Sequence, residues 1–284
     1  MRLEAFMTEL TELQKKLTEL LPNVTFKFQE PMAKHTSFRI GGEVEAMAFP
    51  KNPQELSEIL KVSSLLDCNL AILGAGTNVL APDAGISGLL ICLKDCMDGM
   101  EQVDETHIRV AAGVTMTRCA VYAANLGRSG LEFAHGIPGS VGGGVYMNAG
   151  AYGGEICQVC HSVLEDEGGI VVSVIFTLEK KEPEAIKARM KELMSKRSAS
   201  QPLDLPSAGS AFKRPVGGYA AALIDQTGLK GFRVGGAAIS EKHAGFAVNL
   251  GGATAADVQE LLRQVSDKVF ESTGIRLEPE VRIW

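Results

Sequence analysis

Several features of exported, membrane and nucleic-acid-binding proteins are missing from this 284-residue sequence. The first residues have no basic segment followed by an apolar run, so no secretory signal is expected and we expect a cytoplasmic protein. Lysines and arginines do not form a block, and the net charge is −6, which disfavours nonspecific binding to nucleic acid. The one long uncharged stretch, 135–154, contains a proline and eight glycines, so it predicts a buried loop and not a membrane span.

Common catalytic motifs are also absent. The sequence has no phosphate-binding G-x-x-x-x-G-K-[ST] motif and no zinc-binding H-E-x-x-H motif. Pro138 stands where the serine elbow G-x-S-x-G of hydrolases needs its first glycine. The pair Gly74 and Gly76 lacks the third glycine of a dinucleotide fingerprint, which disfavours a Rossmann fold.

The cysteines predict neither disulfides nor a metal site. Six are present, and without an export signal we expect reduced thiols. Cys157 to His161 matches the C-x-x-C-H pattern of haem attachment, but that chemistry is typical of exported proteins, so two thiols on a cytosolic strand are favoured. No second pair of ligands lies at a zinc-finger spacing, and we expect no metal.

Glycine is abundant, with 31 residues, against a usual level of about 7%. Two glycine-rich turns, 74–80 and 136–144, allow a backbone to approach a ligand closely and to offer N–H groups to phosphate oxygens. Either turn alone would be interpreted as a tight turn. Both together, with the uncharged segment 147–153, favour a bound dinucleotide.

Periodicity and capping signals predict a mixed chain of helices and strands with a domain boundary at a linker-like segment, 198–206. Length alone suggests about two domains. Predicted helices lie at 3–20, from Pro53 after a cap at Asn52, at 115–125, at 182–197 and from Thr254 onward with a capping box to Asp257. Predicted strands lie at 43–49, 69–73, 108–114 and 170–178.

Six motifs occur in order and carry a resemblance: Lys34–Gly42, Leu73–Leu80, Gly136–Gly143, Asn148–Gly153, Pro206–Lys213 and Glu278–Arg282. Together they resemble the UDP-N-acetylenolpyruvoylglucosamine reductases, the MurB family. The short stretch 215–223 is similar to the family's subclass without an inserted tyrosine loop.

The resemblance implies an α+β fold. Residues 1–95 and 96–198 would form two FAD-binding subdomains of the vanillyl-alcohol-oxidase-like type. Residues 199–284 would form a substrate-binding domain whose last strand can return to the flavin.

The implied reaction is the reduction of UDP-N-acetylglucosamine enolpyruvate to UDP-N-acetylmuramate for peptidoglycan. FAD is the implied cofactor and NADPH the implied hydride donor. We expect a monomer that binds neither membrane nor nucleic acid.

By the same resemblance, Ser210 is the expected proton donor and Glu280 the acidic catalytic residue, which needs a raised pKa if it donates a proton. Tyr152 and Arg214 are expected to contact substrate. The expected cofactor-binding residues are Arg39, Gly74, Ala75, Gly76, Thr77, Asn78, Val79, Gly136, Ile137, Pro138, Gly139, Ser140, Gly142 and Gly143. For Glu278 we expect an ion pair with Arg282, and His35 and His243 receive no catalytic role.

One departure from the family stands out. Members carry a Tyr-Arg segment whose arginine assists enolate stabilisation, but here Asp166 passes directly to Glu167. Either the segment is deleted, which impairs catalysis, or a mobile loop is missing from the sequence, and we expect the second. Two other functions stay open: a flavin oxidase of the same superfamily, which Ser210 and Glu280 disfavour, and a catalytically inactive protein that binds flavin or a nucleotide sugar.

Overall fold

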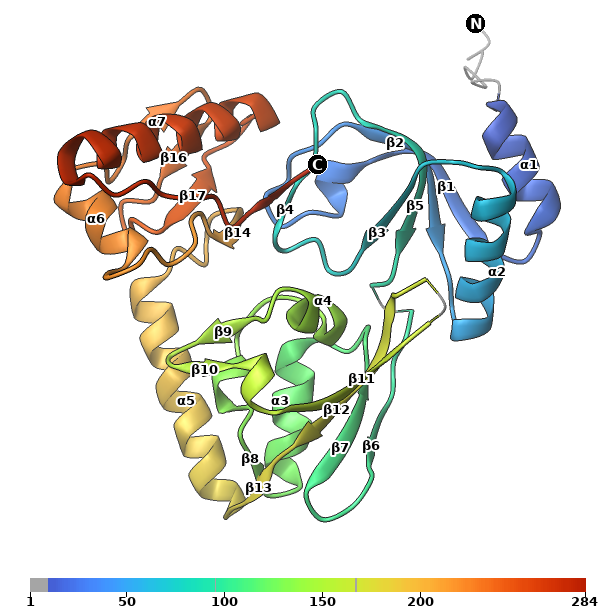
Figure 1. The fold of residues 1–284 in the computed structure, drawn as a ribbon, viewed down its shortest axis with the longest axis horizontal. Helices are drawn as coiled ribbons and strands as arrows, with labels where there is room; N and C mark the ends of the chain where they lie inside the picture. Colours follow the sequence, from blue (N-terminus) through green and yellow to red (C-terminus); the bar gives the residue numbers. More distant parts are fainter. Residues whose placement is uncertain (1–9, 95, 167) are drawn as a thin grey trace, which may run out of the picture.

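Three lobes, each built on a four-stranded sheet, form the molecule (Figure 1). The structure is a computed structural model that describes residues 10–94, 96–166 and 168–284. Separate apolar clusters lie in the first lobe, the second lobe and the C-terminal lobe. The chain therefore has mixed α and β structure, with a core of its own in each lobe.

The first lobe holds a sheet with strand order β1-β2-β5-β3. Asn52 begins α2 as expected, because its side-chain oxygen accepts a hydrogen bond from the Glu55 backbone N–H at 2.8 Å. The predicted amino-terminal helix begins only at Glu12, and its positions 3, 6 and 7 lie outside the described residues. The elements are α1 (Glu12–Leu20), β1 (Thr25–Pro31), η1 (Met32–Lys34), β2 (Glu43–Phe49), α2 (Pro53–Leu65), β3 (Leu70–Leu73), β4 (Val79–Leu80) and β5 (Ile86–Cys92).

The second lobe holds an antiparallel sheet with strand order β11-β12-β7-β6. The long helix α5 runs along this lobe and up to the C-terminal lobe (Figure 1). Its elements are β6 (Met100–Gln102), β7 (His107–Ala111), α3 (Met116–Asn125), β8 (Arg128–Ser129), η2 (Glu132–Ala134), α4 (Val141–Tyr146), β9 (Gly150–Ala151), β10 (Gly154–Glu155), η3 (Ile156–Gln158), β11 (Cys160–Glu165), β12 (Val171–Thr177), β13 (Glu179–Lys180) and α5 (Pro183–Ser200).

The stretch 135–154 differs from the predicted buried loop. It contains the helix α4 and the strand β9, and Pro138, Tyr146 and Gly150 are exposed. Ser140 starts the helix, since its Oγ accepts a hydrogen bond from the Gly143 N–H at 3.3 Å. The expectation was wrong because glycines that serve a turn also permit a short helix. In the described part of the chain, no helix is long and apolar enough to cross a membrane.

A tight turn joins β11 to β12 at the place where the family segment was expected. The Asp166 N–H donates to the Ile170 carbonyl at 3.0 Å, and the Asp166 carboxylate accepts from the Gly168 and Ile170 N–H groups at 2.9 and 2.8 Å. The strands pair antiparallel up to Glu165 and Val171. Because the full sequence is continuous here, the expectation of a missing mobile loop was wrong.

The C-terminal lobe packs its helices on a sheet with strand order β14-β17-β16-β15. Helix α7 begins with the expected capping box between Thr254 and Asp257. The linker expected from Ser198 starts later, because α5 continues to Ser200. The elements are β14 (Ser207–Ser210), α6 (Ala220–Gln226), β15 (Arg233–Val234), β16 (Ala237–Ile239), β17 (Phe246–Asn249), α7 (Ala255–Thr273) and β18 (Arg282–Ile283).

The C-terminal lobe contacts the first lobe at several places, among them a strand pairing and a helix N-terminus. Strand β18 leaves its own lobe and pairs in parallel with β4, with Arg282 opposite Val79. The Asp83 carboxylate accepts hydrogen bonds from the first N–H groups of α7, at Ala255 (2.7 Å) and Ala256 (3.1 Å). A carboxylate is favourable at a helix N-terminus, so this contact holds α7 against the first lobe.

Candidate active site

The two glycine turns lie against each other between the first and second lobes. The Thr77 hydroxyl donates to the Pro138 carbonyl at 3.2 Å. A β-carbon at Gly74 would lie 2.9 Å from Ser140 Oγ, and one at Gly139 would lie 3.1 Å from Thr77 Oγ1. Side chains at these glycines would fill the cradle, so the residues present fit a ligand whose phosphates bind backbone N–H groups.

The first turn is held by the segment 34–42. The Ser37 N–H donates to the Gly76 carbonyl at 3.0 Å, and Gly76 has a φ of +65°. A methyl group there would collide with the backbone oxygen of His35. Arg39 is exposed and also has a positive φ, of +55°. The segment therefore shapes the turn through its backbone.

The segments that carry the expected proton donor and acidic residue run side by side, with an isolated β-bridge between Phe212 and Pro279. Ser210 ends β14, and the next residue, Ala211, accepts a hydrogen bond through its carbonyl from the Glu280 N–H at 3.0 Å. The Glu280 carbonyl in turn accepts from the Asn78 side chain at 3.2 Å. The C-terminal strand therefore joins the Ser210 motif to the first glycine turn.

Glu278 and Glu280 are two residues apart and differ in environment. Glu278 is exposed and forms an ion pair with Lys213 at 3.1 Å, so the expected pairing with Arg282 was wrong. Glu280 is half-buried, and burial raises the pKa of its carboxyl above the ordinary value, opposed by a smaller effect of Lys213. The raised pKa is the property expected of an acid that must donate a proton.

The expected substrate residues lie on different lobes. Arg214 is exposed, its Nε donates to the Gly218 carbonyl at 3.3 Å, and its guanidinium lies 4.1 Å from the ring centre of Tyr219. Tyr152 belongs to the second lobe, and its ring centre lies 5.7 Å from the guanidinium of Arg197. Sequence reasoning did not single out Arg197, because a lone arginine on a charged helix carries no distinguishing pattern.

The histidines and cysteines remain structural in the described part of the chain. The His35 ring lies 2.9 Å from Glu30, and the His243 ring accepts from the Gly245 N–H at 3.1 Å. None of the six cysteines forms a disulfide in the described part of the chain. Among the described residues, no three histidine, cysteine or acidic side chains gather where they could hold a metal ion.

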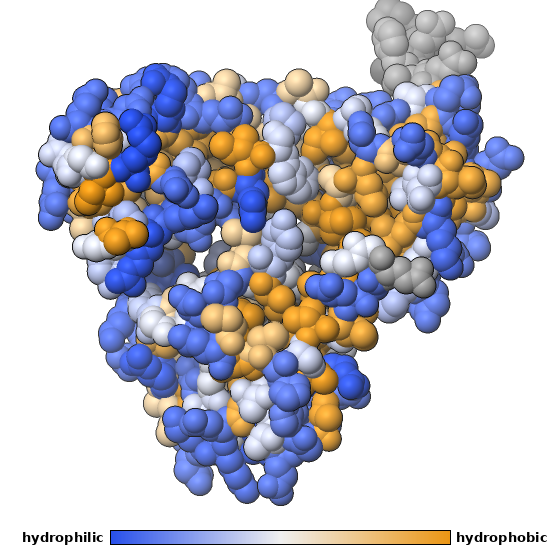
Figure 2. Space-filling model, in the orientation of Figure 1, coloured by the Kyte–Doolittle hydropathy of each residue, from blue (hydrophilic) through white to orange (hydrophobic). Residues whose placement is uncertain are grey.

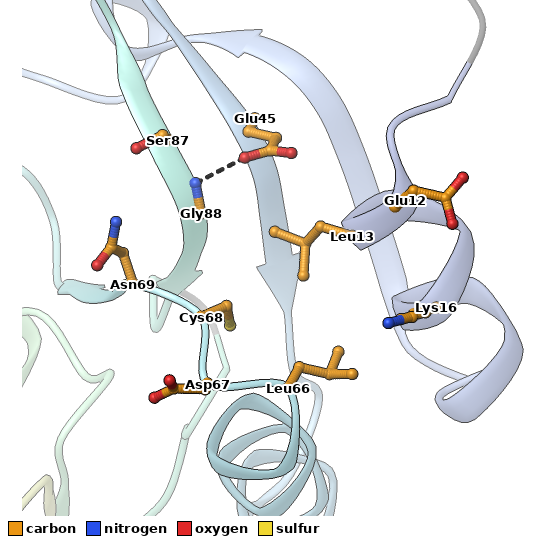
Figure 3. Close-up of a pocket in the computed structure, with 10 residues that line it drawn as sticks. All are labelled: Glu12, Leu13, Lys16, Glu45, Leu66, Asp67, Cys68, Asn69, Ser87 and Gly88. Atoms are coloured by element: carbon orange, nitrogen blue, oxygen red, sulfur yellow. Dashed lines mark hydrogen bonds between the residues drawn. The ribbon is translucent and has the colours of Figure 1, made fainter.

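One cavity of the described structure lies away from the glycine turns. This cavity, of about 350 Å³, lies between α1 and the turn after α2, with Lys16, Glu45 and Asp67 in its lining (Figure 3). The Glu45 carboxylate there accepts from the Gly88 N–H at 2.8 Å. The surface is also hollowed where the C-terminal lobe faces the second lobe (Figure 2).

Comparison with known proteins defines the class first. A family model described as FAD binding domain matches residues 44–167, which contain both glycine turns. A second model, described as UDP-N-acetylenolpyruvoylglucosamine reductase, C-terminal domain, matches residues 201–284. The chain is therefore a flavoprotein whose FAD-binding part precedes a separate C-terminal domain.

Whole-length relatives then define the family. The UDP-N-acetylenolpyruvoylglucosamine reductase of Agathobacter rectalis is 42% identical over 305 residues, covering 95% of this chain and 97% of the relative. That of Streptococcus pneumoniae strain 70585 is 40% identical, with 95% and 98% covered. The crystal structure of the Thermus caldophilus reductase (MurB) has a TM-score of 0.75 at 33% identity, covering 92% of this chain and 99% of that one.

These comparisons show that the chain belongs to the UDP-N-acetylenolpyruvoylglucosamine reductase family. The predicted α+β class, the family and an FAD-dependent oxidoreductase activity are confirmed. The first alignment spans 305 positions although this chain has 284 residues, so part of it has no counterpart here. A segment absent from this chain is consistent with that difference.

Proposed function

We propose that this protein reduces UDP-N-acetylglucosamine enolpyruvate to UDP-N-acetylmuramate, with NADPH as the hydride donor. The observation that carries the proposal is the pairing that places Ser210 and Glu280 next to the first glycine turn. The comparisons support the reaction, because the relatives are named for it.

The glycine turns would hold the cofactor diphosphate through backbone N–H groups. The residues named for this role are those of 74–79 and 136–143, with Arg39 at the edge of the supporting segment. When bound, FAD supplies hydride transfer between NADPH and the substrate alkene. The Thr77 hydroxyl connects the two turns through its hydrogen bond to the Pro138 carbonyl, and the Ser140 hydroxyl caps the helix within the second turn.

Two residues of the C-terminal domain would handle the proton. Once hydride has reached the terminal alkene carbon, the adjacent carbon carries enolate charge and needs one proton. The Ser210 hydroxyl would donate it, since an enolate is a strong base; Ser210 is exposed here, so bound flavin and substrate would have to exclude water from it. Burial raises the pKa of Glu280, which favours the protonated form, and in that form the carboxyl would donate a hydrogen bond to the developing enolate.

The negative charge of the substrate diphosphate would be bound by basic residues that are not already in an ion pair. Arg214 is exposed beside Tyr219 and can reach a diphosphate, whereas Lys213 is already paired with Glu278. Tyr152 would contact substrate from the second lobe. The proposal includes a monomer in the cytoplasm, with the nucleotide sugar and NADPH as its small-molecule partners.

The test is anaerobic NADPH oxidation by the FAD-loaded protein, with and without UDP-N-acetylglucosamine enolpyruvate. The wild type should turn over only with substrate. Ser210→Ala should lose about 10²-fold to 10⁴-fold of that turnover, while NADPH still reduces its flavin. Turnover of Ser210→Ala equal to the wild type would remove Ser210 from the mechanism.

A second candidate function is supported by the short turn after β11. The family's Tyr-Arg segment, whose arginine assists the enolate, has no place between Asp166 and Ile170. A protein that binds FAD and UDP-sugar without turnover would show tight binding of both in titrations but no substrate-dependent NADPH oxidation. Rapid oxidation by oxygen alone would instead indicate a flavin oxidase.

A further inference from the structure

Arg197 is a buried arginine without a carboxylate partner. It lies in the last turn of α5 with 5% of its surface exposed. Its Nη1 donates to the Gln201 side chain at 3.1 Å, and its Nε has no hydrogen-bond partner. Among the residues that the structure describes, none forms an ion pair with it.

Such a group is unfavourable in the protein alone. Burial of a cation without a counter-charge costs free energy, and an unpaired N–H adds to that cost. Burial lowers the pKa of Arg197 below its ordinary value, although an arginine remains charged at neutral pH. A bound group that supplies negative charge or an acceptor oxygen would remove this penalty.

The guanidinium lies where three segments meet. A β-carbon at Gly136, the first residue of the second glycine turn, would lie 3.4 Å from Arg197 Nε and 3.3 Å from its Cδ. Tyr152 packs on the guanidinium from the turn after β9. The free Nε is therefore at the start of the turn whose backbone is expected to bind FAD.

The surroundings add positive and not negative charge. A cavity of about 540 Å³ extends along α5 from Lys187 to Ser198 and reaches His135, and its lining holds two lysines, Lys187 and Lys191, and no acidic residue, although Lys187 forms an ion pair with Glu184. His135, which precedes Gly136, also has a buried Nδ1 without a partner. In a chain of net charge −6, such a local basic region favours an anionic ligand.

We propose that Arg197 is a flavin-binding residue, whose Nε–H donates to an anionic oxygen of bound FAD beside Gly136. FAD presents such oxygens in two places, its diphosphate and the pyrimidine edge of the reduced ring. The inference rests on the FAD binding described above and adds a side chain to a site otherwise built from backbone.

The experiment compares Arg197→Gln and Arg197→Lys with the control Arg128→Gln. Arg128 in β8 is also buried, at 8%, with an unpartnered Nε, but it lies at the other end of α5 (Figure 1). FAD affinity is measured by titrating each apoprotein and following flavin fluorescence. The flavin midpoint potential is measured on the loaded proteins, and the melting temperature with and without FAD.

Arg197→Gln should weaken FAD binding about 10-fold to 100-fold, because a hydrogen bond from a charged donor is lost. Arg197→Lys should weaken it less, since a point charge keeps the attraction but not the Nε geometry. Arg128→Gln should bind FAD like the wild type. The melting temperature of the Arg197→Gln apoprotein should change little, so that the loss is confined to the FAD-bound form.

The flavin midpoint potential distinguishes a contact of Arg197 with the diphosphate of FAD from a contact with its ring. If Nε meets the diphosphate, Arg197→Gln weakens binding of oxidised and reduced FAD alike and leaves the potential unchanged. If it meets the ring, the potential becomes more negative, because reduced flavin loses a stabilising charge. Both outcomes support a flavin-binding role.

Equal FAD affinity and equal potential in Arg197→Gln and the wild type would overturn the inference. If Arg197→Gln does not fold, wild-type affinity in Arg197→Lys would overturn it instead. A change only in the KM for the UDP-sugar would assign Arg197 to substrate and would overturn it as well. Failure of the wild type to bind FAD would defeat the proposed function itself, which is a different result.

Discussion

The C-terminal segment 278–284 and the hairpin formed by β11 and β12 differ in the residues that they carry. The segment contains the expected acidic residue, Glu280, whereas the hairpin lacks the expected arginine. The C-terminal segment pairs with the Ser210 motif on one side and with β4 on the other, so it delivers Glu280 to the glycine turns. The hairpin closes in a tight turn at Asp166 and carries no arginine. Both residues proposed for the proton step are therefore present, whereas the expected charge for the enolate is not supplied by the hairpin.

The largest expected effect concerns the two carboxylates of the C-terminal segment. Glu280→Gln should lower substrate-dependent NADPH oxidation about 10²-fold to 10⁴-fold, because an amide N–H is a much weaker hydrogen-bond donor to the enolate than a carboxylic acid. Glu278→Gln is the matched control and should stay within about twofold, since an exposed ion pair contributes little. Steady-state kinetics of both variants checks this. Equal losses in the two variants would mean that the segment matters only as a scaffold.

A glycine substitution tests the turn to which the C-terminal segment is joined. Gly76→Ala places a β-carbon in the left-handed region and against the His35 backbone oxygen, so the free energy of unfolding should fall by about 2–4 kcal/mol. Gly153→Ala also has a positive φ but meets open space, and should lose only about 1–2 kcal/mol. Urea unfolding of both proteins compares them. A loss no larger in Gly76→Ala than in Gly153→Ala would refute close approach at Gly76.

The pH dependence of stability provides a third test. Burial raises the pKa of folded Glu280 above its unfolded value, so the folded state binds more protons in the window above about 4.5. Stability from this group is present below that pH and is lost as pH rises through the folded pKa. Unfolding free energies of the wild type and Glu280→Gln, measured from pH 4 to 8, should therefore diverge with the wild type declining more. Parallel curves would contradict the raised pKa.

The smallest effect is expected at the hairpin. Asp166→Ala removes an acceptor for two backbone N–H groups and should cost about 1 kcal/mol of stability, while turnover stays within about twofold. Thermal unfolding and NADPH oxidation measure the two quantities. A tenfold loss of turnover at unchanged FAD content would show that this turn takes part in the reaction, and would contradict the view that the hairpin contributes only to stability.

Local signals in the sequence were sufficient for much of the secondary structure. The cap at Asn52, the capping box at Thr254 and the apolar periodicities placed α2 and α7 correctly, because capping and helical spacing depend on residues within one or two turns. The errors lie where local preference allows more than one outcome. The glycines of 135–154 permit both a loop and a short helix, and the polar residues after Arg197 extend α5 to Ser200.

The family and its motifs followed from ordered sequence matches, but the contacts among the motifs did not. Nothing in the spacing of Glu278 and Glu280 shows that one pairs with Lys213 while the other is half-buried. Residues two apart in a regular extended segment would share a face, so the difference does not follow from strand alternation and is decided only by how the lobes pack around this segment.

The sequence by itself determined the composition of the site: glycines without β-carbons, a serine and a glutamate in their motifs, and the direct passage from Asp166 to Glu167. The tertiary structure decided which of these groups meet. It joined β18 to β4, set the two glycine turns against each other and buried the Arg197 guanidinium beside Gly136. The charge and hydrogen-bonding groups of a side chain are fixed by its residue type alone. Its burial and its neighbours depend on the packed chain, because distant segments must come together to create them.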